Sequence, residues 1–459
     1  MMNQAQIDPF LIKKYNQPVP RYTSYPTIPF WQDHISLNRW REQFREQFAI
    51  ENKRSGISLY IHLPFCESLC TYCGCNKKIT TNHTVEEPYL LAIAKEWKQY
   101  RSLMQETPVI RELHLGGGTP TFFSPKNLER LVTTILSDST LHPDYEFSIE
   151  GHPNNTTAAH LAVLASLGFR RISYGVQDMD PEVQRVINRI QPLANVQRAT
   201  DEARKKGFTS VNFDLIYGLP LQTVSGMQTT FQQVLPLQPD RIAFYSYAHV
   251  PWTSRMQRLF DETQLPAPEE KMQLYLEGKK LLLEGGYEDI GMDHFALPHD
   301  ELFRAREAGT LHRNFMGYTI QNSSFLLGLG VSAISDIGNA FAQNKKNLHD
   351  YYNAINTNQP AVKRGYFLSE EDLSFRHYIK DISCKAGTLF DVKDLEILEQ
   401  SSFPLLDQLQ NDGLITYDRK GVKVTPMGHY FIRTICSAFD LYLQRHTATD
   451  NNELFSKAI

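Results

Sequence analysis

The stretch Tyr60-Ile61-His62-Leu63-Pro64-Phe65-Cys66, followed by Cys70, Cys73 and Cys75, decides how the rest of the chain is interpreted. Residues 57–62 are rich in β-branched and aromatic side chains, which predicts a short buried strand that ends at Pro64. Three cysteines then follow on a loop at C-x3-C-x2-C spacing. Three clustered thiolates suit an iron–sulfur cluster with one iron that lacks a cysteine ligand, and this open iron can bind a substrate or cofactor directly.

Two other uses of the cysteines remain open at this point. A structural zinc site usually pairs two C-x2-4-C knuckles or ends in histidines, and here His83 or Cys75 could complete a tetrahedral set. Cys384 and Cys436 lie far along the chain and belong to no such motif. A disulfide framework is disfavoured, because six cysteines in 459 residues are sparse and four of them fall within ten residues. The spacing favours an iron–sulfur cluster over zinc.

The composition is ordinary for a globular protein and excludes several classes of partner. Hydrophobic residues make up 41% and charged residues 21% of the 459, enough for one large domain and a smaller one. A net charge of -4 predicts neither nucleic-acid binding nor attraction to a membrane surface. No apolar run approaches the ~18 residues of a membrane span. Residues 1–9 lack the apolar core of a signal peptide, so we expect a reducing, cytoplasmic location.

Residues 1–50 are predicted to form an N-terminal arm and a helix. The segment Pro20–Thr27 holds two prolines and two tyrosines, which favours extended backbone over helix. Trp40, Phe44 and Phe48 recur at a spacing of four, as on one face of an amphipathic helix.

Residues 51–360 alternate strand-like and helical stretches, which predicts an α/β fold. Strands are expected at 58–62, 112–115, 146–150, 171–175, 210–216 and 241–247, and helices near 86–105, 125–137, 157–167, 181–206 and 225–235. Six β/α units of this length indicate a parallel sheet that is closed or half-closed, as in a partial (β/α)6 TIM-like barrel. The active site of such a barrel lies at the C-terminal ends of the strands.

The residues at these strand ends are polar or glycine in every unit. They comprise the cysteine loop, Gly116-Gly117-Gly118-Thr119-Pro120, Glu150 with His152, Gln177 with Asp178, Asp214 with residues 217–220, and Tyr247-Ala248-His249. Each alone could be a turn or a helix cap, but six together beside a cysteine loop indicate a binding site. The glycine run lacks the G-K-[ST] of a P-loop and the G-x-G-x-x-G dinucleotide fingerprint, so it is a weak candidate for phosphate binding.

Residues 361–459 are predicted to form a mostly helical domain. Helices are expected at 369–384, 391–399 and 403–411, followed by a β-hairpin over 412–425 and a last helix from Pro426. Helices followed by such a hairpin resemble a winged-helix domain. The segment has about as many acidic as basic residues, so we expect a lid or packing role and no DNA binding.

The sequence resembles the oxygen-independent coproporphyrinogen III oxidases (coproporphyrinogen dehydrogenases), which are radical S-adenosylmethionine (SAM) enzymes of haem biosynthesis. The resemblance covers nearly the whole chain. It is carried by Pro20–Thr27, the cysteine loop with its extra Cys75, Gly116–Pro120, Gly175-Val176-Gln177-Asp178, Asp214–Pro220, Gly291–Ala296, His312–Phe315 and Gly330–Ser335.

The resemblance implies two kinds of cofactor, a [4Fe-4S] cluster and two molecules of SAM. Cys66, Cys70 and Cys73 would ligate the cluster, and Cys75 would lie close by without being a ligand. By position, the first SAM would contact Tyr60, Gly117, Glu150 and Ile334, and the second Tyr72, Gly118, Thr119, Gln177, Arg189, Asp214 and Ala248. Carboxylates such as Glu150 and Asp214 suit this role, since they accept hydrogen bonds from ribose hydroxyls or an ammonium group.

The resemblance also implies the reaction. A 5'-deoxyadenosyl radical from SAM would remove a hydrogen from the β-carbon of a propionate of coproporphyrinogen III. Loss of CO2 and one electron then leaves a vinyl group, and two of the four propionates react, which yields protoporphyrinogen IX. An electron donor and a final electron acceptor are needed, and the sequence identifies neither. The substrate carboxylates require cations or N–H donors, for which Arg21, His294, His312 and Arg313 are the candidates.

Two departures from the family pattern leave rival functions open. The chain has Gly151-His152 where the family has Val-Asp, and Met316 where the family has glutamine. The second change is the main indication of one alternative, a radical SAM paralogue that acts on haem or another tetrapyrrole. A haem chaperone of the same superfamily is another, but it typically lacks the Pro20–Pro26 arm and the Cys73–Cys75 ending, which are present here.

Overall fold

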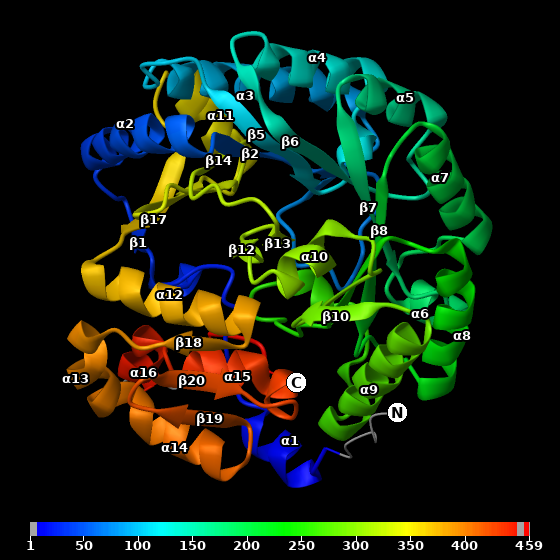
Figure 1. The fold of residues 1–459 in the computed structure, drawn as a ribbon. Coiled ribbons are helices and arrows are strands. Elements are labelled where there is room, and N and C mark those ends of the chain that lie inside the picture. The colour runs from blue at the N-terminus through cyan, green and yellow to red at the C-terminus, as the bar shows by residue number, and fades with distance from the viewer. Residues whose placement is uncertain (1–6, 448–453, 459) are drawn as a thin grey trace.

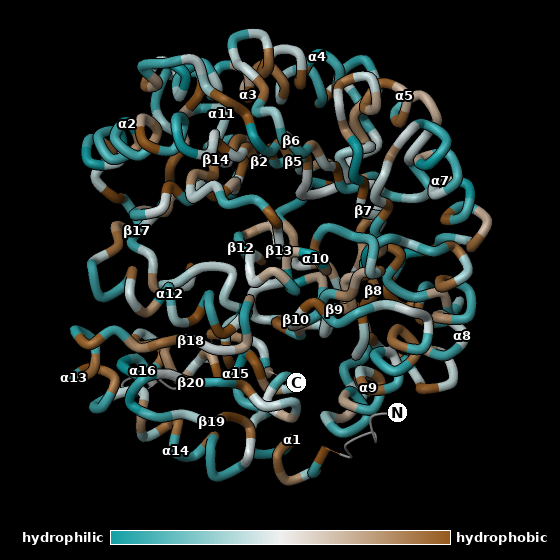
Figure 2. The backbone as a smooth tube through the Cα atoms, in the orientation of Figure 1, coloured by the Kyte–Doolittle hydropathy of each residue, from teal (hydrophilic) through white to brown (hydrophobic). Residues whose placement is uncertain are grey.

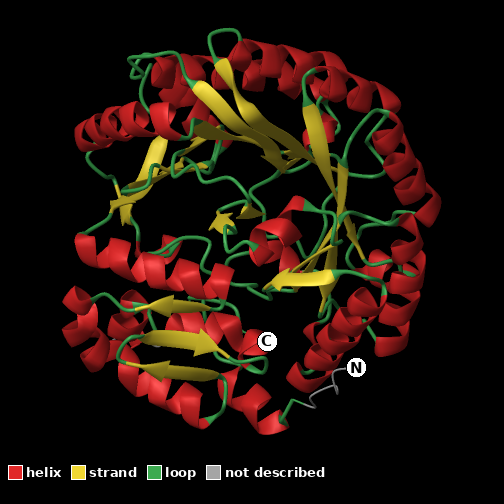
Figure 3. Ribbon diagram, viewed as in Figure 1, coloured by secondary structure: helices red, strands yellow, loops and turns green. Residues whose placement is uncertain are grey.

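A long curved sheet lined by helices forms the body of the protein. The computed structural model describes residues 7–447 and 454–458. In this part of the chain, thirteen strands form one sheet in the order β1-β17-β16-β15-β14-β2-β5-β6-β7-β8-β9-β11-β10. The sheet curves around the middle of the molecule and the helices form an outer ring (Figures 1 and 3). The predicted α/β fold with a partial barrel is confirmed.

The six predicted strands are confirmed as the parallel centre of this sheet. They are β2 (Ile57–Leu63), β5 (Val109–Gly117), β6 (Thr140–Gly151), β7 (Phe169–Gln177), β8 (Ser210–Tyr217) and β9 (Arg241–Ser246). Their apolar side chains are buried. Figure 2 shows hydrophobic residues along β8 and β9 and near β14 and β2. Because neighbouring strands run parallel, their C-terminal ends lie along one edge and bring the predicted site residues together.

The crossover helices are α3 (Glu86–Arg101), α4 (Pro125–Leu136), α5 (Ala158–Ser166), α6 (Pro181–Val186), α7 (Leu193–Lys205) and α8 (Val224–Val234). In α4, Leu128, Leu131, Val132 and Ile135 are buried, which is the helical spacing expected of a face packed against a sheet. The single helical stretch predicted for 181–206 is wrong, because α6 and α7 are separate helices. Pro192 immediately precedes α7 in extended backbone, which is incompatible with one continuous helix.

The sheet extends beyond the predicted barrel on both sides. Next to β2, the strand β14 (Leu326–Leu329) is parallel, and β15 (Ile334–Asp336), β16 (Ala340–Asn344), β17 (Val362–Phe367) and β1 (Gln32–Asp33) continue antiparallel. Beyond β9 lie β11 (His294–Ala296) and β10 (Glu288–Gly291), also antiparallel. A separate hairpin of β12 (His312–Asn314) and β13 (Gly317–Thr319) lies within the ring (Figure 1).

The C-terminal region contains the predicted hairpin. The strands β19 (Ile415–Asp418) and β20 (Gly421–Val424) pair, and β18 (Gly387–Leu389) completes a three-stranded sheet. Around it lie α12 (Glu370–Lys385), α14 (Phe403–Asn411), α15 (Ile432–Ser437) and α16 (Leu441–Thr447). Helical turns run without a break from 392 to 411, where two separate stretches were expected. The division into 1–50, 51–360 and 361–459 stays a prediction, and β17 just beyond the second boundary belongs to the large sheet.

The N-terminal arm contacts the C-terminal region and also the barrel, where Arg21 donates to the carbonyl of Ser246. Tyr22 and Tyr25 are buried, and the Tyr22 hydroxyl donates to Asp440 at 3.0 Å. The helix α1 (Pro9–Tyr15), which was not predicted, packs Tyr15 against Phe431 with ring centroids 5.6 Å apart. The helix α2 (Leu37–Arg54) confirms the amphipathic helix expected after the arm. No helix in residues 7–447 or 454–458 is long and apolar enough to span a membrane.

Candidate active site at the cysteine loop

The cysteine loop is fastened to the C-terminal end of β5 by backbone hydrogen bonds. The N–H of Gly118 donates to the carbonyl of Leu63 at 2.9 Å, and the N–H of Thr119 donates to that of Phe65 at 3.0 Å. Cys66 itself lies in the short strand β3 (Phe65–Cys66). The loop and the glycine run, which are distant in sequence, therefore form one unit.

The glycines at the end of β5 are required by this close approach. Gly117 has a φ of +116°, a backbone conformation that other residues rarely adopt. A Cβ at Gly118 would lie 2.6 Å from the carbonyl carbon and oxygen of Pro64. The run therefore allows two backbones to pack directly against each other, and this explains it without a phosphate ligand.

Two side chains donate hydrogen bonds to the cysteine sulfurs. The Thr119 hydroxyl lies 3.3 Å from the Sγ of Cys66, and Nη1 of Arg189 lies 3.6 Å from the Sγ of Cys70. Burial raises the pKa of the Cys66 thiol to about 11, whereas a hydrogen bond from Cys75 lowers the pKa of Cys73 to about 6 against the effect of burial. Hydrogen bonds and a positive charge at sulfur are features that tune and stabilise thiolate-bound clusters.

The donor set fits an iron–sulfur cluster better than a single metal ion. All six cysteines are free thiols. Within the described residues, no three His, Cys, Asp or Glu side chains gather closely enough to hold one metal ion. The ligands of a [4Fe-4S] cluster bind different irons and need not converge on one point.

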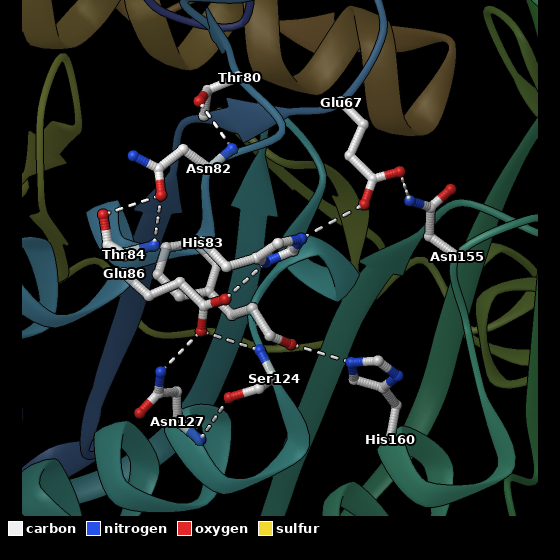
Figure 4. Close-up of polar contacts among 11 residues, drawn as sticks. Glu67, Thr80, Asn82, His83, Thr84, Glu86, Ser124, Asn127, Asn155 and His160 are labelled. Carbon is white, nitrogen blue, oxygen red and sulfur yellow. Dashed lines mark hydrogen bonds and ion pairs between the residues drawn. The ribbon is translucent and has the colours of Figure 1, made fainter.

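The outer side of the loop is held by a chain of polar contacts (Figure 4). Asn155 donates to the Glu67 carboxylate at 2.7 Å, and His83 lies between Glu67 at 3.6 Å and Glu86 at 2.8 Å. Glu86 in turn accepts from the backbone N–H of Ser124, the residue that precedes α4, at 2.9 Å. His83 also stacks on Phe122 at 4.3 Å. Both ring nitrogens of His83 thus face carboxylates, so it supports the loop and does not complete a zinc site.

The carboxylate of Glu150 lies beside the glycine run. Its Oε2 accepts from the N–H of Gly117 at 2.9 Å, and its Oε1 lies 3.4 Å from Nε2 of His114. Removal of the carboxylate from water would by itself raise the pKa of Glu150, but the hydrogen bonds from His114 and Gly117 outweigh this effect and lower the pKa. Glu150 is therefore an anion, and 43% of its side chain remains exposed and able to meet a ligand.

The strands β7 and β8 bring Gln177 and Asp214 to the same edge, and the segment between α6 and α7 adds Arg189. Burial and then the charge of Glu150 raise the pKa of Asp214 to about 7. The Asp214 carboxylate accepts from Ser173 at 3.2 Å. Arg189 donates through Nη2 to the carbonyl of Gly175 at 2.6 Å, two residues before Gln177. Arg189 thus bridges the end of β7 and the sulfur of Cys70.

Tyr72 and Ala248 are joined by a residue that the sequence did not reveal. Nε2 of Gln257 donates to the carbonyls of Tyr72 and Ala248, both at 3.0 Å, and Oε1 accepts from the N–H of Val250 at 2.6 Å. The Gln257 side chain is 1% exposed. It ties the cysteine loop to the loop after β9. Only its position beyond a predicted strand could have drawn attention to it.

Tyr60 and Ile334 come from the strands β2 and β15. The Tyr60 hydroxyl is 3.0 Å from Nδ1 of His62, and its ring stacks on His114, which bonds Glu150, at 5.9 Å. Ile334 begins β15, whose neighbour β14 pairs with β2. Tyr60, Glu150 and Ile334 therefore belong to alternate strands of one sheet, with β14 between Ile334 and Tyr60 and β5 between Tyr60 and Glu150.

The four candidates for substrate binding do not all gather together. Arg21 donates to the carbonyl of Ser246 and lies over the ring of Tyr245 at 5.9 Å. His294 lies 3.5 Å from the Tyr245 hydroxyl, and burial and then the charge of Arg313 lower the pKa of His294. The pKa of His312 is lowered by burial and then by Lys380 and Lys385 of α12. Arg21, His294 and Arg313 thus form one group, and His312 lies towards α12.

Comparisons with known proteins agree with this geometry. The model of the radical SAM superfamily matches residues 60–234. Oxygen-independent coproporphyrinogen III oxidases from Synechocystis and Escherichia coli are each 40% identical, over 98% and 97% of this chain and 97% of each relative. A solved structure of coproporphyrinogen III oxidase from Escherichia coli, a radical SAM enzyme, aligns with a TM-score of 0.88 and 38% identity over 96% of this chain and all of that one. The chain therefore belongs to the family of oxygen-independent coproporphyrinogen III oxidases within the radical SAM superfamily.

Proposed function

We propose that the protein converts coproporphyrinogen III to protoporphyrinogen IX by oxidative decarboxylation of two propionates to vinyl groups, without oxygen. The observation that carries this proposal is the cysteine loop at the C-terminal edge of the barrel, with donors at two of its sulfurs and an anionic Glu150 beside it. Full-length similarity to enzymes named for this activity supports the substrate. We place the reaction in the cytoplasm, with an electron donor and a final acceptor of unknown identity.

The residues fit a [4Fe-4S] cluster held by Cys66, Cys70 and Cys73, together with two molecules of SAM. When bound, the reduced cluster and SAM supply the 5'-deoxyadenosyl radical. Thr119 and Arg189 would stabilise the cysteine sulfurs through the hydrogen bonds described above. The protein thus supplies orientation and charge, and the difficult chemistry belongs to the cofactors.

Two groups of residues would hold the SAM molecules. Tyr60, Gly117, Glu150 and Ile334 are proposed for the first, and Tyr72, Gly118, Thr119, Gln177, Arg189, Asp214 and Ala248 for the second. Glu150 has a lowered pKa and would accept from an ammonium or hydroxyl group. Arg21, His294, His312 and Arg313 remain the proposed substrate-binding residues.

The proposal is tested by reconstituting the protein without oxygen and adding reductant, SAM and coproporphyrinogen III. Products are oxidised and separated by chromatography. We expect protoporphyrin together with matching 5'-deoxyadenosine. Formation of 5'-deoxyadenosine without protoporphyrin would retain radical SAM chemistry and reject the substrate. Tight haem binding without SAM turnover would indicate a chaperone instead.

Gln257 provides a separate prediction about positioning. In Gln257→Leu the carbonyls of Tyr72 and Ala248 and the N–H of Val250 lose their partner, and each such loss costs about 1 kcal/mol or more. We expect SAM to bind about tenfold more weakly at the second site. The measurement is SAM bound per protein by equilibrium dialysis at several concentrations. Gln408→Leu, at an exposed position of α14, is the control. Unchanged stoichiometry and affinity would show that Gln257 does not position the site.

A further inference from the structure

His294 and Arg313 lie on the inner side of the sheet near Asp214. His294 of β11 pairs with Ala243 of β9, which in turn pairs with Asp214 of β8. Directly paired residues of neighbouring strands point to the same face of a sheet. His294 and Asp214 therefore face the same side. Arg313 comes from the β12–β13 hairpin, which lies within the ring of strands and helices (Figure 1).

This group contains buried donors that have no partner. Arg313 is 9% exposed, and its Nε and Nη1 are buried without a hydrogen bond. Its guanidinium lies over the ring of Tyr318 at 4.7 Å. Nδ1 of His294 is also buried without a partner, while its Nε2 faces the Tyr245 hydroxyl at 3.5 Å. Three buried nitrogen atoms of two side chains that both contact the Tyr318 ring are therefore unsatisfied.

The cluster also lacks a counter-charge. Among the ion pairs of the described residues, two arginines of the barrel strands each contact a carboxylate: Arg241 contacts Asp300 at 2.7 Å, and Arg171 contacts Glu146. No such pair includes Arg313. The nearby acids Asp214, Asp289 and Asp293 act on the surrounding tyrosines from a distance and do not bond Arg313. An unpaired buried charge is strongly unfavourable, so it indicates a missing anionic partner.

We propose that Arg313 and His294 form the subsite that binds one carboxylate of the tetracarboxylate substrate. This inference rests on the proposed function and adds which residues hold a propionate. Nε and Nη1 of Arg313 donate to the carboxylate. In the tautomer that this subsite requires, Nε2 of His294 accepts from the Tyr245 hydroxyl and Nδ1 carries the proton that is donated to the ligand. Burial and the charges of Arg313 and Arg241 lower the pKa of His294 to about 3, so the ring is neutral and has one N–H.

His312 is not part of this subsite. It is adjacent to Arg313 in β12, and successive side chains of a strand point to opposite faces. Its charged neighbours are Lys380, Lys385 and Asp381 of α12. The structure thus separates two neighbouring candidates that the sequence presented together.

The test compares Arg313→Met, Arg313→Lys and His294→Phe with the wild type in the reconstituted holoenzyme. Coproporphyrin III, the oxidised and fluorescent form of the substrate, is the binding probe, and KM and kcat are measured with coproporphyrinogen III. We expect Arg313→Met to weaken binding and raise KM by roughly tenfold or more, with a smaller effect on kcat. Arg313→Lys restores part of the affinity because it restores the charge. Arg185→Met, at an exposed pair with Glu182, is the control for activity.

Thermal unfolding without substrate separates binding from a structural role. Removal of an unpaired buried charge does not lower Tm, so we expect the Tm of Arg313→Met to equal or exceed that of the wild type. Arg241→Met breaks the buried pair with Asp300 and lowers Tm. If the wild type forms protoporphyrin but Arg313→Met keeps its KM and its affinity for coproporphyrin III, the subsite is overturned and the proposed function stands. The same holds if Arg313→Met loses as much Tm as Arg241→Met. A wild type without turnover would reject the proposed function and the subsite with it.

Discussion

Cys70→Ala is expected to abolish cluster assembly and to lower turnover at least about 100-fold, because the change removes one of three thiolate ligands. The structure adds a second reason. Nη1 of Arg189, 3.6 Å from the Cys70 sulfur, loses its acceptor, and its Nε is already buried without a partner. Iron and sulfide content after reconstitution, together with the visible absorption of the cluster, measure the effect.

Cys384→Ala is the matched control for this change. Cys384 is 9% exposed and Cys70 is 8% exposed, so both substitutions remove a sulfur of similar burial. Cys384 lies in α12, outside the cysteine loop, and its sulfur is 3.8 Å from the Ser383 hydroxyl. We expect the iron content of Cys384→Ala to match that of the wild type. Full cluster content in Cys70→Ala, or an equal loss in both variants, would refute the assignment of Cys70 as a ligand.

Gly118→Ala is expected to reduce both cluster content and activity by more than about tenfold. The added Cβ would lie 2.6 Å from the backbone of Pro64 and 3.0 Å from the carbonyl of Phe65, and backbone atoms cannot move aside as a flexible side chain can. The end of β5 and the cysteine loop must separate, which breaks the bonds from Gly118 to Leu63 and from Thr119 to Phe65. Thr119 would then leave the Cys66 sulfur.

The control for this prediction comes from the cysteine loop itself. A Cβ at Gly74 would meet no atom within 4 Å, so Gly74→Ala adds the same methyl group without a clash. We expect the cluster absorption of Gly74→Ala to resemble that of the wild type. If Gly118→Ala also assembles a full cluster and turns over normally, the close packing of the two backbones is not required.

The sequence alone was sufficient for the parallel centre of the fold and for the cysteine loop. Apolar runs such as 210–216 predict strands because the pattern of apolar residues, alternate or continuous, is a local property of the sequence. The spacing of Cys66, Cys70 and Cys73 is likewise local. The position of Glu150 and Asp214 beside this loop followed from one rule, since parallel strands place their C-terminal ends along one edge.

Tertiary structure alone decided which distant groups support or complete the site. Gln257 joins Tyr72 to Ala248 across about 180 residues of sequence, and no local pattern marks such a contact. The strands β14 to β17 were not predicted from the sequence, because they are short and their own periodicity is weak. Pairing with neighbouring strands places them in the sheet. His312 and Arg313 are adjacent in sequence, yet one lies towards α12 and the other towards His294, because a strand directs consecutive side chains to opposite faces. Residue types and their spacing thus determined the chemistry available to this protein, and long-range packing determined which of these groups are left unpaired and able to bind a ligand.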